Sequence, residues 1–163
     1  MLNIVRNQAL EAAKKRLHLS FSQARQYSQC SLAYRFKYLE ARPAESVSVN
    51  LLFGKAVHDA CADFNFSLIE GKPMDVAEVE RRFEQAFTNH ISEEKTPISF
   101  KKDDMACLMA KGKAMARLFA ERPRQNKVIY VEHPILVPFN HPRTGDYMLD
   151  LFGIVDWAEL TPD

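Results

Sequence analysis

The stretch V-I-Y-V-E-H-P-I-L-V-P-F, which runs from Val128 to Phe139, leads through N-H-P-R-T-G-D into Y-M-L-D-L-F-G-I-V-D-W-A-E-L, which ends at Leu160. β-Branched and aromatic residues are dense in both apolar runs, as they are in strands. The segment between the runs is rich in residues that favour turns. The sequence therefore predicts a strand, a turn and then one or two further strands, arranged as an antiparallel meander.

The chain before Lys127 has the spacing of amphipathic helices instead. Apolar residues recur three and four positions apart. Ser20, Ser22 and Asp75 are placed to cap helix starts, because a side-chain oxygen accepts a hydrogen bond from a free amide of the first turn. Helices are expected at residues 4–17, 20–39 (one helix or two short ones), 51–68, 75–92 and 103–122, with a loop at 45–50.

The composition indicates a globular protein. Helices first and strands last favour an α+β fold, and the length favours a single domain, residues 1–163. No apolar run approaches the roughly 20 residues that cross a bilayer, so no membrane partner is expected. The three cysteines are odd in number and far apart, which favours free thiols and a cytoplasmic location over disulfides.

Charge is unevenly distributed although the net charge is only +1. Lysine and arginine outnumber acids in residues 1–45 and again in residues 101–127, whereas residues 145–163 hold acids and no base. Two basic segments beside an acidic one suit a phosphate-binding surface around a cation site. Solvated helix faces would give the same pattern, so charge alone leaves both interpretations open.

Three motifs occur in an order that resembles one family. The first is L-S-F-S-Q-A-R-Q-Y-S-Q-C-S-L-A-Y-R-F-K-Y, Leu19 to Tyr38; the second is G-K-A-V-H, ending at His58; the third is F-G-I-V-D, ending at Asp156, with the pair Val131-Glu132 on the strand before it. Together they resemble the opening part of the RecB-like nucleases of the PD-(D/E)XK family. Ser31 departs from the pattern, because the family often has proline after the cysteine.

The resemblance implies a fold and an activity. The fold would be the restriction-endonuclease-like α/β core, and the activity would be metal-dependent phosphodiester hydrolysis on DNA by an exonuclease or repair nuclease. A helicase or other repair subunit would be a possible partner. The family's D/E-x-K tripeptide is expected a short hairpin after Asp156 and does not occur in residues 157–163. The 163 residues are therefore expected to be the N-terminal portion of such a domain and to show little nuclease activity by themselves.

The resemblance also implies the site residues. Asp156 would be the central ligand of Mg²⁺ or Mn²⁺, His58 an auxiliary ligand from a helix, and Glu132 an outer carboxylate, so that all three are catalytic candidates. Alternatives remain for each: Asp156 as an exposed turn acid, His58 as a core histidine bonded to a carbonyl, and Glu132 as a strand acid paired with a lysine.

Further residues are candidates for substrate and cluster binding. Some relatives hold an iron–sulfur cluster with one cysteine at the position of Cys30, but Cys61 and Cys107 lack cluster spacing, and His58 with Cys61 lacks the second pair that a zinc site needs. Tyr27, Tyr34 and Tyr38 could stack on bases or simply pack. A degenerate nuclease fold that only binds DNA or protein, and a helical scaffold with chance motifs, are the rival interpretations. The cations that would contact DNA are Arg25, Arg35, Lys37, Lys111, Lys113 and Arg117.

Overall fold

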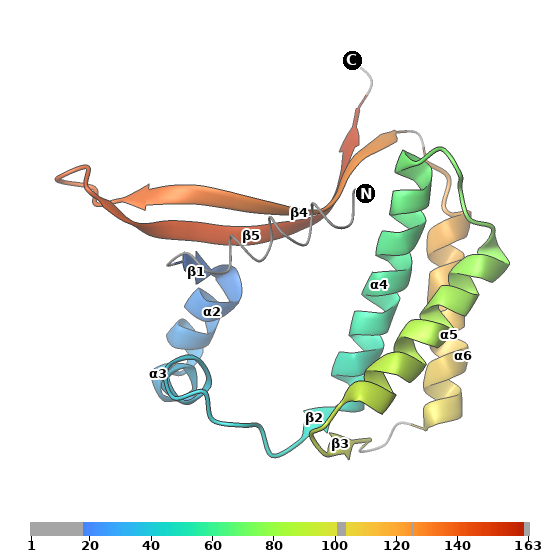
Figure 1. The fold of residues 1–163 in the computed structure, drawn as a ribbon, viewed down its shortest axis with the longest axis horizontal. Helices are drawn as coiled ribbons and strands as arrows, with labels where there is room; N and C mark the ends of the chain where they lie inside the picture. The colour runs from blue at the N-terminus through green and yellow to red at the C-terminus, as the bar shows by residue number, and fades with distance from the viewer. Residues whose placement is uncertain (1–17, 101–103, 125, 162–163) are drawn as a thin grey trace. The chain divides into compact units, whose positions relative to one another are not determined.

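The C-terminal strands β4 (Lys127–Asn140) and β5 (Tyr147–Leu160) form the long hairpin that the sequence predicts (Figure 1). This computed structural model describes residues 18–100, 104–124 and 126–161, so the helix expected at 4–17 lies outside the described residues. At the turn, the amide of His141 donates to the carbonyl of Asp146 over 2.7 Å. Gly145 has a φ of 76°, which glycine adopts without a steric cost.

A short N-terminal strand, β1 (His18–Ser20), extends the hairpin into a sheet of order β1-β5-β4. β1 runs parallel to β5, with His18 opposite Asp150 and Ser20 opposite Phe152. The predicted α+β class is thereby confirmed, but the sheet is mixed and not a pure antiparallel meander. β4 is an edge strand, which explains how it accommodates Pro134 and Pro138, since proline has no amide to donate to a neighbour.

The segment after β1 forms short helices, as predicted. α2 (Phe21–Gln29) begins at Ser20, whose hydroxyl accepts from the amide of Gln23 while the Gln23 side chain accepts from the Ser20 amide. α3 (Ser31–Tyr34) follows after Cys30, and the chain then widens into a π-helix, η1 (Arg35–Leu39). The tyrosines and cations of the first motif, Leu19 to Tyr38, therefore lie on helices.

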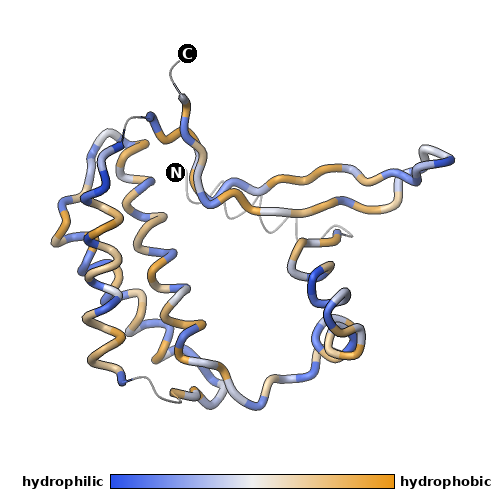
Figure 2. Tube along the Cα trace, turned by 180° about the vertical axis from the view of Figure 1, so that it is seen from behind, coloured by the Kyte–Doolittle hydropathy of each residue, from blue (hydrophilic) through white to orange (hydrophobic). Residues whose placement is uncertain are grey.

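Three longer helices contain the hydrophobic core: α4 (Val49–Ile69), α5 (Val76–Glu93) and α6 (Met105–Glu121). Their apolar positions recur along each helix (Figure 2). Phe53, Phe83 and Phe87 are buried and in mutual ring contact, with centroids 5.7–5.8 Å apart. The predicted loop at 45–50 is wrong in part, because Val47–Ser48 is a strand, β2, that pairs in parallel with β3 (Ile98–Ser99), and α4 begins at Val49.

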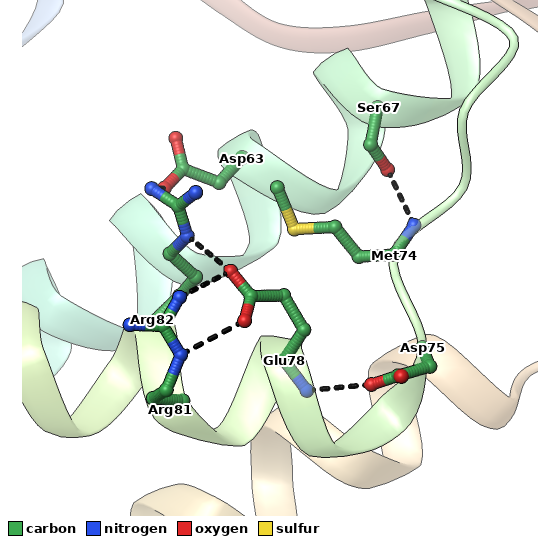
Figure 3. Close-up of polar contacts among 7 residues, drawn as sticks. All are labelled: Asp63, Ser67, Met74, Asp75, Glu78, Arg81 and Arg82. Carbon is green, nitrogen blue, oxygen red and sulfur yellow. Dashed lines mark hydrogen bonds and ion pairs between the residues drawn. The ribbon is translucent and has the colours of Figure 1, made fainter.

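The connection from α4 to α5 is fixed by side-chain hydrogen bonds (Figure 3). The hydroxyl of Ser67 accepts from the amide of Met74 over 3.1 Å, and Asp75 caps α5 as predicted, accepting from the amide of Glu78 over 2.8 Å. Glu78 in turn accepts from Arg81 and Arg82, and these hydrogen bonds lower its pKa. None of the described helices is long and apolar enough to cross a membrane.

The chain divides into two compact units. The sheet unit comprises residues up to 43 together with 132–156, and the helical unit comprises 44–131 together with 157–163. Both strands of the hairpin contribute residues to each unit. Whether the units form the single domain that length suggests stays a prediction.

Candidate metal centre

Two acids on neighbouring strands form a carboxylate pair. Glu132 belongs to β4 and Asp156 to β5, and a carboxylate oxygen of one lies within 4.8 Å of a carboxylate oxygen of the other. Asp156 is exposed and Glu132 is half-buried. The Asp156 carboxylate therefore reaches solvent, whereas one carboxylate oxygen of Glu132 is buried.

Regular hairpin pairing would not bring these two side chains together. Counted back from the turn, where His141 faces Asp146, regular pairing places Glu132 opposite Val155, and residues directly opposite each other point to the same face of a sheet. Asp156 would then point to the other face. One additional residue in β4 corrects the register, which is what a β-bulge does.

The backbone of β4 departs from regular strand geometry at Glu132. This residue has a φ of 50°, in the left-handed region that non-glycine residues adopt at a cost of roughly 1–3 kcal/mol. Nearby, Val128 and Val131 are both buried although their spacing of three would put them on opposite faces of a regular strand. Bulges and left-handed residues are over-represented beside active sites, where they redirect a side chain.

The separation of the carboxylates fits one shared divalent cation. Magnesium bonds oxygens at roughly 2.0–2.1 Å in an octahedral shell, so two of its ligands lie about 3 Å apart when adjacent and about 4 Å apart when opposite. The carboxylate oxygens lie within 4.8 Å of each other, so a small side-chain movement would bring both into the shell of one ion. Carboxylate oxygens are also the donors that Mg²⁺ and Mn²⁺ prefer.

His58 lies on α4, in the helical unit, whereas Glu132 and Asp156 belong to the sheet unit. Its place beside the two carboxylates therefore stays a prediction. The alternative that His58 is a core residue is wrong, because the side chain is exposed while Ala56 and Ala60 line the buried face of the same helix.

A neighbour of His58 fixes this part of α4 and was not singled out from the sequence. Asp59 lies 2.6 Å from the Nε2 atom of His90 on α5, which joins the two helices beside His58. The two residues are 31 positions apart, and only the packing of α4 on α5 reveals their contact.

The predicted DNA-contacting cations fall into two groups. Arg35 pairs with Glu40 at 2.5 Å, Lys113 with Glu84 at 2.7 Å, and Arg117 with Glu80 at 2.6 Å. The hydrogen bond to Glu80 raises the pKa of the Arg117 guanidinium. The remaining three, Arg25, Lys37 and Lys111, form no ion pair with an acid within the described part of the chain.

The cysteines named as possible cluster or zinc ligands, Cys30 and Cys61, differ in exposure and contacts. Cys30 is exposed and caps α3, its Sγ atom accepting from the amide of Ala33 over 3.4 Å. Cys61 is half-buried, and burial raises the pKa of its thiol to about 11, against an opposing effect of Arg124. A thiol that stays protonated at neutral pH suits packing better than zinc binding. Cluster binding by Cys30 stays a prediction.

The carboxylate pair on the hairpin of this α+β fold is a candidate site for a hard divalent cation. A family model described as the PD-(D/E)XK nuclease superfamily matches residues 18–163. This chain belongs to the PD-(D/E)XK nuclease superfamily, a family of nuclease-type enzymes that generally use divalent metals and act on DNA. Neither the comparison with curated proteins nor the comparison with solved structures finds a match.

Proposed function

We propose that this chain belongs to a RecB-like DNA nuclease of the exonuclease or repair type, in which Glu132, Asp156 and His58 hold a catalytic Mg²⁺ or Mn²⁺. The observation that carries the proposal is the carboxylate pair, within 4.8 Å on adjacent strands. The order of the three sequence motifs favours the RecB-like branch. The free cysteines favour action in the cytoplasm, and a helicase or repair subunit is the partner that the same branch implies.

Each residue of the proposed site has a physical role. Asp156 supplies a carboxylate from a strand, which restricts its movement. Glu132 supplies the second carboxylate, aimed by its left-handed backbone. His58 contributes a nitrogen donor, which manganese accepts more readily than magnesium does. The ligand set thus predicts tighter binding of Mn²⁺ than of Mg²⁺.

The charge of the pair explains why a cation is needed. Two carboxylates alone repel the phosphodiester of an approaching strand. A bound divalent cation supplies the chemistry of the site by lowering the pKa of its bound water and offsetting charge on the phosphoryl oxygens. Glu132 and Asp156 hold their oxygens in place for it, so little reorganisation is needed when the substrate arrives.

The proposal is tested by titrating the purified chain with Mn²⁺ and measuring free ion by electron paramagnetic resonance. We expect one site that Asp156→Ala abolishes and that Glu132→Gln weakens at least tenfold. Asp146→Asn is the matched control, because this exposed acid lies in the turn of the same hairpin. Equal affinity in the wild type and both site variants would refute the proposed metal centre.

The role of His58 is tested separately with His58→Ala. We expect weaker Mn²⁺ binding and a smaller preference for Mn²⁺ over Mg²⁺, because only oxygen donors remain. His141→Asn is the control histidine, since asparagine can still accept the turn hydrogen bonds that the His141 ring accepts. Unchanged binding in His58→Ala would remove His58 from the site and leave the carboxylate pair standing.

Hydrolysis itself is measured on labelled DNA with Mn²⁺ present. Any cleavage that comes from this site must disappear in Asp156→Ala and in the presence of EDTA. Cleavage that survives both conditions would contradict the proposed mechanism. Binding of DNA with no carboxylate-dependent metal site would favour the alternative of a non-catalytic module.

A further inference from the structure

A pocket of about 400 Å³ lies between α2 and η1 in the sheet unit. Its volume is within the range of roughly 300–1,000 Å³ that small-molecule sites occupy. Its lining combines two cations, polar side chains and two aromatic rings. The cations are Arg25 and Lys37, and the rings are those of Phe21 and Tyr38.

The two cations of the pocket differ from the other cations of the same segment. Neither Arg25 nor Lys37 forms an ion pair with an acid in the described ranges, and both are exposed. The Nζ atom of Lys37 lies 5.1 Å from the centroid of the Tyr38 ring, so this cation and this ring are adjacent in the pocket. By contrast, Arg35 and Arg42 share the carboxylate of Glu40, at 2.5 and 2.6 Å. Positive charge is therefore neutralised outside the pocket and left available within it, which suits an anionic ligand.

Aromatic rings continue from the pocket across the helical surface. Tyr38 lies 5.0 Å from Tyr34 between ring centroids, and Tyr34 lies 5.4 Å from Tyr27. Ordinary packing would bury such rings, yet Tyr27 is 61% exposed and Phe21, at the pocket, is 78% exposed. Exposed rings beside cations that have no acidic partner are what proteins use to stack bases while phosphates are neutralised.

The backbone carries the pocket on an uncommon turn. η1 is a π-helix, in which the carbonyl of Arg35 accepts from the amide of Glu40 over 2.9 Å. π-Turns occur frequently at functional sites. Lys37 and Tyr38, the two pocket residues of η1, both lie within this turn.

From these observations we propose that the pocket binds one nucleotide of single-stranded DNA. Arg25 and Lys37 neutralise its phosphates, and its base stacks against the Tyr38 and Phe21 rings. The base must be unpaired, because a duplex keeps its ring faces stacked on each other. The inference rests on the proposed function for its choice of DNA, and it adds that the strand is presented single-stranded.

Binding is measured by fluorescence anisotropy of a labelled oligothymidine strand on the full chain in EDTA, so that no metal contributes. We expect Tyr38→Leu to weaken binding about tenfold, the loss of one stacked base, and Tyr38→Phe to bind as the wild type does. Arg25→Gln with Lys37→Gln should weaken binding and lower the slope of log affinity against log salt by about 1.4, or about 0.7 per phosphate contact.

Arg42→Gln is the charge-matched control and should bind as the wild type does, since Arg42 already pairs with Glu40. A blunt duplex of equal length should bind more weakly and should not respond to Tyr38→Leu. Circular dichroism melting confirms that each variant folds. Wild-type affinity in Tyr38→Leu, or an equal loss in Arg42→Gln, would overturn the pocket assignment.

Separate measurements distinguish failure of the pocket proposal from failure of the metal-centre proposal. Asp156→Ala should retain strand binding in EDTA although it loses Mn²⁺. If the pocket variants bind DNA normally while Mn²⁺ binding still depends on Asp156, the pocket does not bind a nucleotide and the proposed function stands. If strand binding depends on Tyr38 but no carboxylate-dependent Mn²⁺ site exists, the pocket stands and the nuclease proposal fails.

Discussion

Replacing Gly112 with alanine tests the packing of α5 on α6 most sharply. Gly112 is buried on α6, and a Cβ atom there would enter the ring of Phe83, whose Cε2 atom would be 2.5 Å away with two further ring atoms closer still. Carbon atoms in contact are usually about 3.5–4.0 Å apart. Phe83 is fully buried and stacked on Phe87, so its ring has nowhere to move without displacing the core.

The expected cost follows from two opposing effects. Overpacking a well-packed core costs typically about 1–3 kcal/mol, and a clash with a buried ring belongs at the upper end. Alanine in a helix interior recovers about 1 kcal/mol relative to glycine. The net loss in unfolding free energy is therefore about 2 kcal/mol, which lowers the melting temperature by roughly 4–8 °C in a chain of this size.

Thermal and urea melting of Gly112→Ala by circular dichroism measure this loss. Gly54→Ala is the matched control on α4, because a Cβ atom there would meet nothing within 4 Å. It should raise stability by up to about 1 kcal/mol, since only helix propensity changes. If Gly112→Ala were as stable as the wild type, the close approach of α6 to Phe83 would be refuted.

Three further predictions concern Cys61, Glu78 and Glu132. Because burial raises the pKa of Cys61 to about 11, iodoacetamide at pH 8 should modify the two exposed cysteines well before it, and mass spectrometry showing Cys61 modified first would contradict this. Hydrogen bonds from Arg81 and Arg82 lower the pKa of Glu78. The stability that Glu78 contributes is therefore present above the usual glutamate pKa and is lost as the pH falls through the lowered pKa. An NMR titration should show an ordinary glutamate pKa once both arginines are replaced with alanine. Glu132→Gly should relieve its left-handed backbone and cost no more than about 1 kcal/mol of stability while Mn²⁺ affinity falls, and a larger loss on urea unfolding would count against the strained backbone.

The sequence predicts the elements with strong local signals. The helical period and the Asp75 cap define α5 to within a residue or two, and the turn between Phe139 and Tyr147 defines the hairpin. The three residues of β1 are too few to show a period, and their partner strand lies about 130 positions further along the chain. Tertiary pairing of that kind leaves no local signal, which is why the mixed sheet was not predicted.

The site shows the same division between local and tertiary information. The motifs identify Glu132 and Asp156 as candidates, but regular alternation would place their side chains on opposite faces of the hairpin. The left-handed backbone at Glu132 breaks that alternation, and no residue type in V-E-H-P predicts it. Ion pairing is likewise invisible in the sequence, where Lys37 and Arg35 look alike although only Arg35 has an acidic partner among the described residues.

In the proposed metal centre, the carboxylates of Glu132 and Asp156 share one divalent cation. Crystals soaked in MnCl₂ and measured at the manganese absorption edge test it directly by anomalous scattering. We expect a single strong peak bonded to carboxylate oxygens of Glu132 and Asp156, with a ring nitrogen of His58 as the third proposed ligand. A map with no peak at the two carboxylates, or with manganese bound only to other residues, would refute the proposed metal centre.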